Sequence, residues 1–561
     1  MAAGAAALFA AAGLSSTSGS IALAQSQPYD LLITNARIID GSGGPSVNGS
    51  VAVRGGRVVG VGQVTGPAAR TIDAGGLVVA PGFIDPHSHS DFPLLVDGNA
   101  ESKIRQGVTT EVIGESGSVA PREASPGAAP DARGTGIRAD WTDFTGYFAA
   151  LGRHGTAVNI LSYVGLGQVR EVVMDHEQRA PTAAELAKMS GLVRDAMRQG
   201  AWGVSTGLIY PPNAYAKLDE LVALSKPAAA AGGMYASHLR YDGDRLVDGV
   251  EEAIAIGEQA HLPVHIFHLK VTGRNNFGRM KEVIALVEAA RKRGVEVGAD
   301  QYPYVASSTG LTATLPPWAQ EGGTSSLVER LHSREARARL RREMEDPHPA
   351  YENRYESAGT WHNIQIASVA GRAADDKQYE GMRIDEAAKK AGKDPFDFVF
   401  DLLAAERGGV SCVYFIIDEA DLTLAMRQPW VSIGSDGSAL ATSGPLRRGV
   451  PHPRNFGTFP RVLGRYVRDL HVLTLEQAVH KMSGLTASQL RIPNRGLIRD
   501  GYAADLVIFD PATVADRATF TDPFQYPVGI DTVIVNGTVV LDHGRHTGEH
   551  PGVVIYGRGK R

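Results

Sequence analysis

Short apolar segments alternate with amphipathic segments through most of the chain. The apolar segments are rich in Val and Ile, as buried β-strands are, and they end near Asp85, Glu115, Tyr163, Thr206, Ser237, Phe267, Asp300 and Ser435. Between several of them, apolar residues recur at three- and four-residue spacing, as in residues 246–260 and 279–294, which predicts amphipathic helices. A further helix is predicted between Thr182 and Gly200, because Thr is typical of a helix start and Gly of a helix end.

Strands that alternate with helices predict an α/β fold whose strands are parallel. Eight such units favour a (β/α)8 TIM-like barrel over residues 81–489, and a doubly wound open sheet is the alternative. An insertion at residues 309–427 precedes the last barrel strand and is too long for a loop, so we expect it to fold partly on its own. Its charged stretch at residues 329–346 predicts one solvated helix.

The two ends of the chain show a different pattern, in which short apolar runs are broken by Gly pairs and an Asn-Gly turn. Residues 26–80 and 490–552 are therefore expected to pair into one small β domain. Residues 1–24 are rich in Ala, carry no charged side chain and end in an A-x-A cleavage pattern, which indicates an export signal and a periplasmic or secreted protein. A disordered tail is the alternative, and no stretch is suited to span a membrane.

Composition limits the partners of the protein. The 561 residues include 56 basic and 61 acidic side chains and form no basic stripe, so we expect a small-molecule substrate and no nucleic acid. The single cysteine, Cys412, excludes an internal disulfide and a thiolate cluster, so a metal site must use His, Asp and Glu. We interpret Cys412 as a buried apolar residue. Nothing in the sequence indicates the oligomeric state.

Six residues that can bind a metal follow five of the predicted strands. Because the carboxyl ends of barrel strands share one rim, we expect these side chains to meet. They are His87 and His89 after the first strand, Glu115 after the second, His238 after the fifth, His268 after the sixth and Asp436 after the eighth. His87 and His89 are two residues apart and point to the same side of an extended strand. Such ligands suit Zn²⁺, with manganese, iron and cobalt as competitors.

A cation held in this way indicates hydrolytic chemistry. It lowers the pKa of a bound water toward neutrality, supplies hydroxide and polarises a carbonyl group. Asp436 is our candidate to take the proton from that water and to give it to a leaving nitrogen. The alternative is that Asp436 is only a ligand or a turn residue.

The motifs around these residues resemble the D-aminoacylase (N-acyl-D-amino-acid deacylase) family of the amidohydrolase superfamily. They are PGFIDPHSHSD, GVTTEVIG, ASHLRYDGDRL, HLKVTGRNNFGR, DQYPYVASSTGL, LPPWAQEGG, IGSDGSAL and PHPRNFGTFPRVL. The resemblance covers nearly all of the chain after the export segment. It implies a zinc-bearing barrel, a small β-sandwich and hydrolysis of N-acyl-D-amino acids to a carboxylate and a free D-amino acid.

The resemblance also implies residues for the substrate carboxylate, namely Lys270, Tyr302 and Ser308. Arg240, two residues after His238, is a second cationic candidate, because Arg can bind a carboxylate through two parallel hydrogen bonds. For each of these residues the alternative is a surface or structural ion pair. His265 is expected to face away from the site, and His452 is expected either to line the pocket or to pack in its loop.

The motif after the second strand departs from the family pattern. The family usually has a cysteine ligand in an Asn-Cys-Gly stretch, whereas this chain has Glu115, Ser116 and Gly117. Ser is a poor ligand, Glu can bridge two cations, and the fourth strand, WGVSTGLIY, has no Lys for the carbamylated bridge of other amidohydrolases. We therefore predict one or two Zn²⁺ ions and favour a binuclear centre bridged by Glu115.

The same departure leaves two other functions open. One is a broader amide or cyclic-amide hydrolase that acts on a peptide-like or xenobiotic compound. The other is a non-catalytic exported binding protein of the same fold, although the complete set of predicted ligands argues against it.

Overall fold

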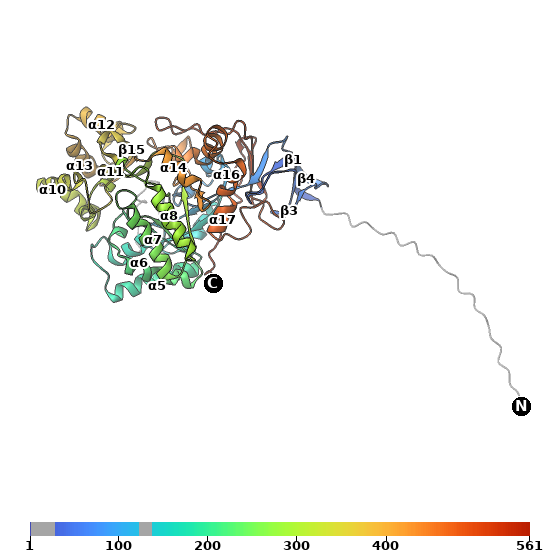
Figure 1. Cartoon of the computed structure of the whole chain (residues 1–561), viewed down its shortest axis with the longest axis horizontal. Coiled ribbons are helices and arrows are strands. Elements are labelled where there is room, and N and C mark those ends of the chain that lie inside the picture. Colours follow the sequence, from blue (N-terminus) through green and yellow to red (C-terminus); the bar gives the residue numbers. More distant parts are fainter. Residues whose placement is uncertain (2–27, 123–136, 138) are drawn as a thin grey trace.

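The computed structural model describes residues 1, 28–122, 137 and 139–561 (Figure 1). Apart from Met1, the export signal predicted at residues 1–24 lies outside the described residues. Of the described helices, none combines the length with the apolar composition that a membrane span requires.

Parallel strands form the barrel that the alternating pattern predicts. In chain order these strands are β6 (Phe83–Asp85), β7 (Val108–Ile113), β8 (Asn159–Ser162), β9 (Val164–Gly165), β10 (Val204–Gly207), β11 (Tyr235–His238), β12 (Val264–Ile266), β13 (Val297–Gln301) and β17 (Val431–Ile433). Their hydrogen bonds run in the order β6-β7-β8 and β9-β10-β11-β12-β13-β17. Only Tyr163 separates β8 from β9, so the two are halves of the third barrel strand.

Helices follow the strands and pack against one another around the barrel. They are α1 (Pro93–Val96), α2 (Glu101–Ile104), α3 (Phe144–His154), α4 (Leu166–Met174), α5 (Ala183–Gln199), α6 (Leu218–Ala230), α7 (Leu246–Ala260), α8 (Met280–Lys292), α14 (Glu419–Met426), α15 (Arg454–Arg461), the π-helix η8 (Val462–Asp469), α16 (Leu475–Met482) and α17 (Gly484–Gln489). Helix α5 contacts α6, α6 contacts α7, α7 contacts α8, and α8 contacts α14. The predicted boundaries of α5 are confirmed, because Thr182 forms a capping box with Glu185 and Gly200 ends the helix at a φ of 108°.

One sheet of nine described strands joins the two ends of the chain. It contains β1 (Tyr29–Ile38), β2 (Val47–Arg54), β3 (Arg57–Gly62), β4 (Ala68–Asp73), β5 (Val78–Pro81), β18 (Leu506–Phe509), β19 (Ile530–Val535), β20 (Thr538–Asp542) and β21 (Arg545–His546). Strand β18 pairs antiparallel with β5, so that Val507 lies opposite Ala80. This pairing attaches the end of the chain to its beginning.

The apolar segment that ends at Asp85 forms two strands in place of the single strand predicted. Strand β5 belongs to the terminal sheet and β6 to the barrel, with Gly82 between them. A Cβ atom at Gly82 would lie 2.3 Å from Oγ1 and Cγ2 of Thr109. The chain can therefore pass from one sheet to the other only where it has no side chain.

The long segment between β13 and α14 forms a separate layer, seen at the upper left of Figure 1. Its elements include an antiparallel sheet, in the order β14-β16-β15, and five helices among the described residues. They are β14 (Ser307–Gly310), α9 (Gly323–His332), α10 (Arg334–Met344), α11 (Arg354–Ala358), β15 (Ile364–Val369), α12 (Ile384–Ala391), α13 (Pro395–Ala405) and β16 (Val410–Tyr414). The prediction of one helix over residues 329–346 is wrong, because Ser333 ends α9 and its side chain caps α10 by accepting a hydrogen bond from Ala336 N.

Candidate metal centre

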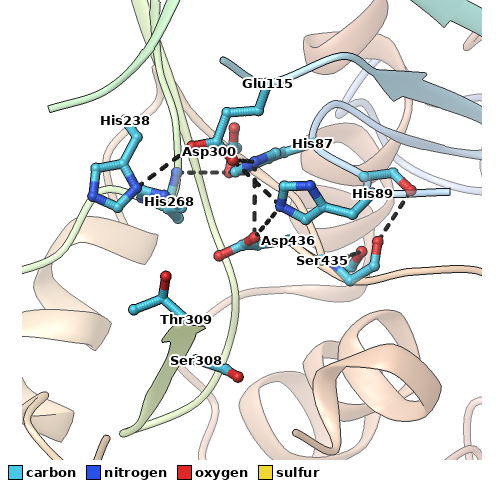
Figure 2. Close-up of polar contacts among 12 residues, drawn as sticks. His87, His89, Glu115, His238, His268, Asp300, Ser308, Thr309, Ser435 and Asp436 are labelled. Atoms are coloured by element: carbon cyan, nitrogen blue, oxygen red, sulfur yellow. Dashed lines mark hydrogen bonds and ion pairs between the residues drawn. The ribbon is translucent and has the colours of Figure 1, made fainter. Parts of the chain in front are cut away.

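The carboxyl ends of the barrel strands bring the six predicted metal ligands together (Figure 2). They form two groups, within each of which one ligand atom per residue lies within 4.8 Å of the others. The first group is His87, His89, Glu115 and Asp436, and the second is Glu115, His238 and His268. The predicted convergence of these side chains is thus present, and Glu115 belongs to both groups.

Glu115 uses its two carboxylate oxygens in different directions. Oε2 lies 2.8 Å from Nε2 of His87 and 3.3 Å from Nε2 of His89, whereas Oε1 lies 3.6 Å from Nδ1 of His238. Burial alone would raise the pKa of Glu115, but the hydrogen bonds to His87 and His89 lower it well below its usual value. An ionised carboxylate that faces both groups is suited to bridge two cations. The neighbouring Ser116 turns its hydroxyl to Asn213 Oδ1, 3.3 Å away.

Asp436 follows the last barrel strand in a left-handed turn with a φ of 49°. Its Oδ1 lies 2.9 Å from Nε2 of His89, and its Oδ2 lies 2.8 Å from Nη1 of Arg454. Burial would raise the pKa of Asp436, but the charges of Arg454 and His87 lower it below its usual value. The carboxylates of Asp436 and Glu115 raise the pKa of His89 to about 9, although burial opposes this shift. Positive charge is therefore favoured between the two carboxylates.

The histidines of the second group are held in their neutral form. Burial and the charge of Lys270 lower the pKa of His238 to about 3, and the same two causes lower that of His268 well below its usual value. Nε2 of His238 and Nδ1 of His87 are buried and have no hydrogen-bond partner among the described residues. Neutral imidazoles beside an ionised carboxylate are the ligands that Zn²⁺ and similar cations prefer, so the residues present fit divalent metal ions.

A cavity of about 680 Å³ opens beside these two groups. Lys270, Tyr302 and Ser308 line it, as the resemblance implies. The hydroxyl of Tyr302 is buried and has no hydrogen-bond partner among the described residues, whereas Ser308 Oγ donates to Cys412 O at 2.9 Å. Tyr302 is thus the better placed of the two to donate a hydrogen bond to a ligand.

Arg240, the second cationic candidate for the substrate carboxylate, lies outside the lining of this cavity. Its guanidinium binds both carboxylate oxygens of Glu252, at 2.8 and 3.0 Å, and the backbone oxygens of Ala214 and Ala216. Strand β11 ends at His238, so the two-residue alternation that would align Arg240 with His238 does not continue to it.

A buried charged cluster supports one wall of the cavity. Lys270 Nζ lies 2.9 Å from Oδ2 of Asp242, and Arg354 binds the same carboxylate through Nη1 at 2.6 Å and Nη2 at 2.9 Å. Glu352 Oε1 lies 3.2 Å from Arg354 Nη1. Burial, and then the charge of Asp242, raise the pKa of Glu352 to about 8. With Glu352 protonated, the cluster carries two positive charges and one negative charge beside the cavity.

Several residues of the site were not predicted as such. Arg454 lines the cavity and pairs with Asp436, and its guanidinium lies over the Tyr302 ring, 5.0 Å from the ring centre. Asp300 accepts hydrogen bonds from His268 N at 2.9 Å and from His265 Nε2 at 2.8 Å. The only signal for Asp300 was its place at a strand end, and Arg454 lay in the quoted PHPRNFG motif.

Two histidines outside the ligand groups now have defined places. His265 is buried, and its bond to Asp300 supports the strand that carries His268. His452 lines the cavity and also packs within its loop, since its Nε2 lies 2.9 Å from Ala306 O. Both alternatives considered for His452 therefore apply.

Similarity to known proteins agrees with this geometry. The sequence profile described as "Amidohydrolase family" matches residues 70–541. The chain belongs to the amidohydrolase family. A D-aminoacylase of Alcaligenes xylosoxydans xylosoxydans is 39% identical to this amidohydrolase over 541 residues, which are 94% of this chain and 98% of the relative.

Two solved structures resemble this amidohydrolase over 94% of its chain and 100% of theirs, each with a TM-score of 0.79. One is an N-acyl-D-glutamate deacylase of Bordetella bronchiseptica, 34% identical, in complex with zinc and a phosphonate inhibitor that mimics the tetrahedral intermediate. The other is a D-aminoacylase, 36% identical, which has a binuclear metal centre with one-metal activation and second-metal attenuation. These likenesses agree with the barrel and the terminal sheet.

Proposed function

We propose that this amidohydrolase cleaves the amide bond of N-acyl-D-amino acids with the help of one or two divalent metal ions, Zn²⁺ in the first instance. The observation that carries the proposal is the position of Glu115, whose two oxygens face two separate groups of ligands beside the cavity. The D-amino-acid substrate class comes from relatives of 34 and 39% identity, a D-glutamate deacylase and a D-aminoacylase.

The six converging residues would hold the metal, with Glu115 shared between two ions. When bound, such an ion lowers the pKa of a water molecule and polarises the amide carbonyl. Arg454 keeps the Asp436 carboxylate ionised and fixes it through Oδ2. Asp436 can therefore accept a proton on a carboxylate oxygen and later give it to the leaving nitrogen.

The cavity wall next to His268, where Lys270 Nζ lies 2.9 Å from His268 Nδ1, suits the carboxylate of the substrate. Tyr302 offers an unused hydroxyl donor, and Lys270 and Arg354 add positive charge that Asp242 only partly balances. A free carboxylate placed here would direct the neighbouring amide toward the metal ligands. This is the arrangement expected for an N-acyl amino acid, which carries both groups close together.

The test is a panel of hydrolysis assays on the purified full-length chain, whose metal content is measured in parallel. N-acetyl-D-amino acids should be cleaved, N-acetyl-L-amino acids much more slowly, and activity should vanish with a chelator and return with Zn²⁺. Preferential cleavage of hydantoins or aryl amides would support the broader amide hydrolase instead. A chain that binds no ion and stays inert with zinc, manganese or cobalt would refute the proposal.

The role of Glu115 has its own comparison. Glu115→Gln should lower the number of bound ions, because it removes the charge from the ligand that both groups share. Ser116→Ala is the matched control, since Ser116 is adjacent but turns its hydroxyl toward Asn213, and it should keep the metal content. Equal metal content in the native chain and Glu115→Gln would contradict a bridging carboxylate.

A further inference from the structure

The barrel has a seam between its first and last strands, β6 and β17. Among the described strands, β6 has a ladder only with β7, and β17 only with β13. Across the seam, the described backbone-to-backbone contacts are an isolated bridge between Ser88 and Gly437 and two hydrogen bonds, from Asp436 N to His87 O and from His89 N to Gly437 O, both 2.9 Å. Side chains add direct links, because Asp85 accepts hydrogen bonds from Ser435 N, at 2.9 Å, and from Ser435 Oγ, and Ser88 Oγ donates to Gly437 O at 3.1 Å. The seam therefore passes directly between the His87–His89 pair and Asp436.

A lysine from outside both strands occupies the space beneath this seam. Lys103 lies on the short helix α2, and its side chain has no exposed surface. Its Nζ lies 2.8 Å from Asp85 Oδ2 and 3.2 Å from Ser88 Oγ on the first-strand side. It lies 2.9 Å from Ser435 Oγ and 3.2 Å from Gly437 O on the last-strand side. One ammonium thus binds both sides of the seam.

Three of the four partners of Lys103 are immediate neighbours of the predicted metal ligands. Ser88 lies between His87 and His89, while Ser435 and Gly437 flank Asp436. Lys103 itself lies beneath the rim and outside the cavity lining. Its direct contacts reach the site through the positions of these neighbours.

The two ligand groups differ in their relation to the seam. The first group takes His87 and His89 from one side of it and Asp436 from the other. The second takes His238 from the end of β11, His268 from the segment after β12, and the shared Glu115 from the segment after β7. A change in the width of the seam would alter the first group and leave the second nearly intact. A variant that affects only the first group would therefore indicate a positioning role, whereas a general loss of folding would affect both groups.

We propose that Lys103 is a positioning residue of the metal centre, which closes the barrel seam and thereby sets the distance between the His87–His89 pair and Asp436. The inference rests on the proposed function, because it assumes that the first group holds an ion. Residues that orient metal ligands from behind typically change metal affinity by about 10- to 100-fold when they are removed. We expect that loss for the ion of the first group alone.

The test is zinc release from the zinc-loaded full-length chain to an excess of chelator, followed with a colorimetric zinc indicator. The native chain should release two ions in two phases. Lys103→Met should release one ion about 10- to 100-fold faster and the other at the native rate. Lys481→Met is the matched control, because Lys481 is also buried and binds Val431 O, at 2.8 Å, at the opposite end of β17. It should release both ions at the native rates.

A second variant covers the case in which Lys103→Met does not fold, since that change leaves the buried Asp85 without its positively charged partner. Ser435→Ala keeps the Lys103–Asp85 pair and removes the hydroxyl through which the last-strand side binds both Lys103 Nζ and Asp85 Oδ2, so it should accelerate release of the same single ion. Native rates for both ions in the folded variants would overturn the proposal, as would equal acceleration of both ions or the same effect in Lys481→Met. A native chain that binds no zinc would instead refute the proposed function.

Discussion

Replacement of Glu352 by Gln tests the charged cluster beside the cavity through the pH dependence of stability. Glu352 is buried against Asp242 and Arg354, and its pKa is raised to about 8 from an ordinary value of 4.5. Between these values the folded chain keeps a proton that the unfolded chain releases. The free energy of unfolding therefore falls as pH rises, and the stability that the protonated Glu352 provides is present below pH 4.5 and lost by pH 8.

The size of this effect follows from the shift. Each unit of pKa difference corresponds to about 1.4 kcal/mol, so the contribution of Glu352 should fall by at most about 4 to 5 kcal/mol across this range. Gln imitates the protonated carboxyl group and cannot ionise. Relative to the native chain, Glu352→Gln should therefore become progressively more stable from pH 5 to pH 8.

The measurement is the unfolding midpoint in urea or on heating, for metal-free native and variant chains at several pH values. Glu335→Gln is the matched control, because Glu335 is exposed on α10, and its difference from the native chain should not change with pH. A difference between Glu352→Gln and the native chain that stays constant from pH 5 to pH 8 would refute the reasoning. It would mean that Glu352 is ionised in the folded protein and that the cluster carries no net charge.

Three further predictions concern catalysis, binding and folding. Asp436→Asn should remove most of the kcat, by about 100-fold or more, since an amide cannot shuttle a proton; activity close to native in a steady-state assay would exclude the shuttle. Tyr302→Phe should raise KM for N-acyl-D-amino acids more than it lowers kcat, and an unchanged KM would show that its hydroxyl does not bind substrate. Gly82→Ala should lower the free energy of unfolding by about 1 to 3 kcal/mol, because its Cβ would overlap Thr109, and equal urea midpoints would contradict this contact.

Much of the barrel could be predicted because its strands are buried on both faces and read as apolar runs. Helix α5 could be placed to the residue, since Thr182 and Gly200 act through local hydrogen bonds and backbone geometry. The division of the first apolar segment into two strands at Gly82 could not be predicted, because it depends on a contact with Thr109, which is distant in the sequence. The end of α9 at Ser333 could not be predicted either. The periodic pattern of residues 329–346 fits one continuous helix as well as two helices with Ser333 as the cap of the second.

The metal ligands could be predicted because each follows a barrel strand, and such strand ends meet at one rim. Their partners were harder to find. Arg454 and Lys103 come from helices outside the barrel strands, so no spacing rule relates them to Asp436. Arg240 follows His238 by two residues, but β11 ends at His238, so the alternation of side chains along a strand does not extend to Arg240.

The passage from β5 to β6 through the single residue Gly82 links the terminal sheet to the barrel, and this link limits where the chain can be truncated. Strand β6 leads directly to His87, while β5 is clamped by β18 from the far end of the chain. A truncated version that lacks β18 would leave β5 without this partner, and β5 leads through Gly82 to the strand that precedes the first two histidines. The terminal sheet thus supports the catalytic barrel and cannot be removed without affecting it.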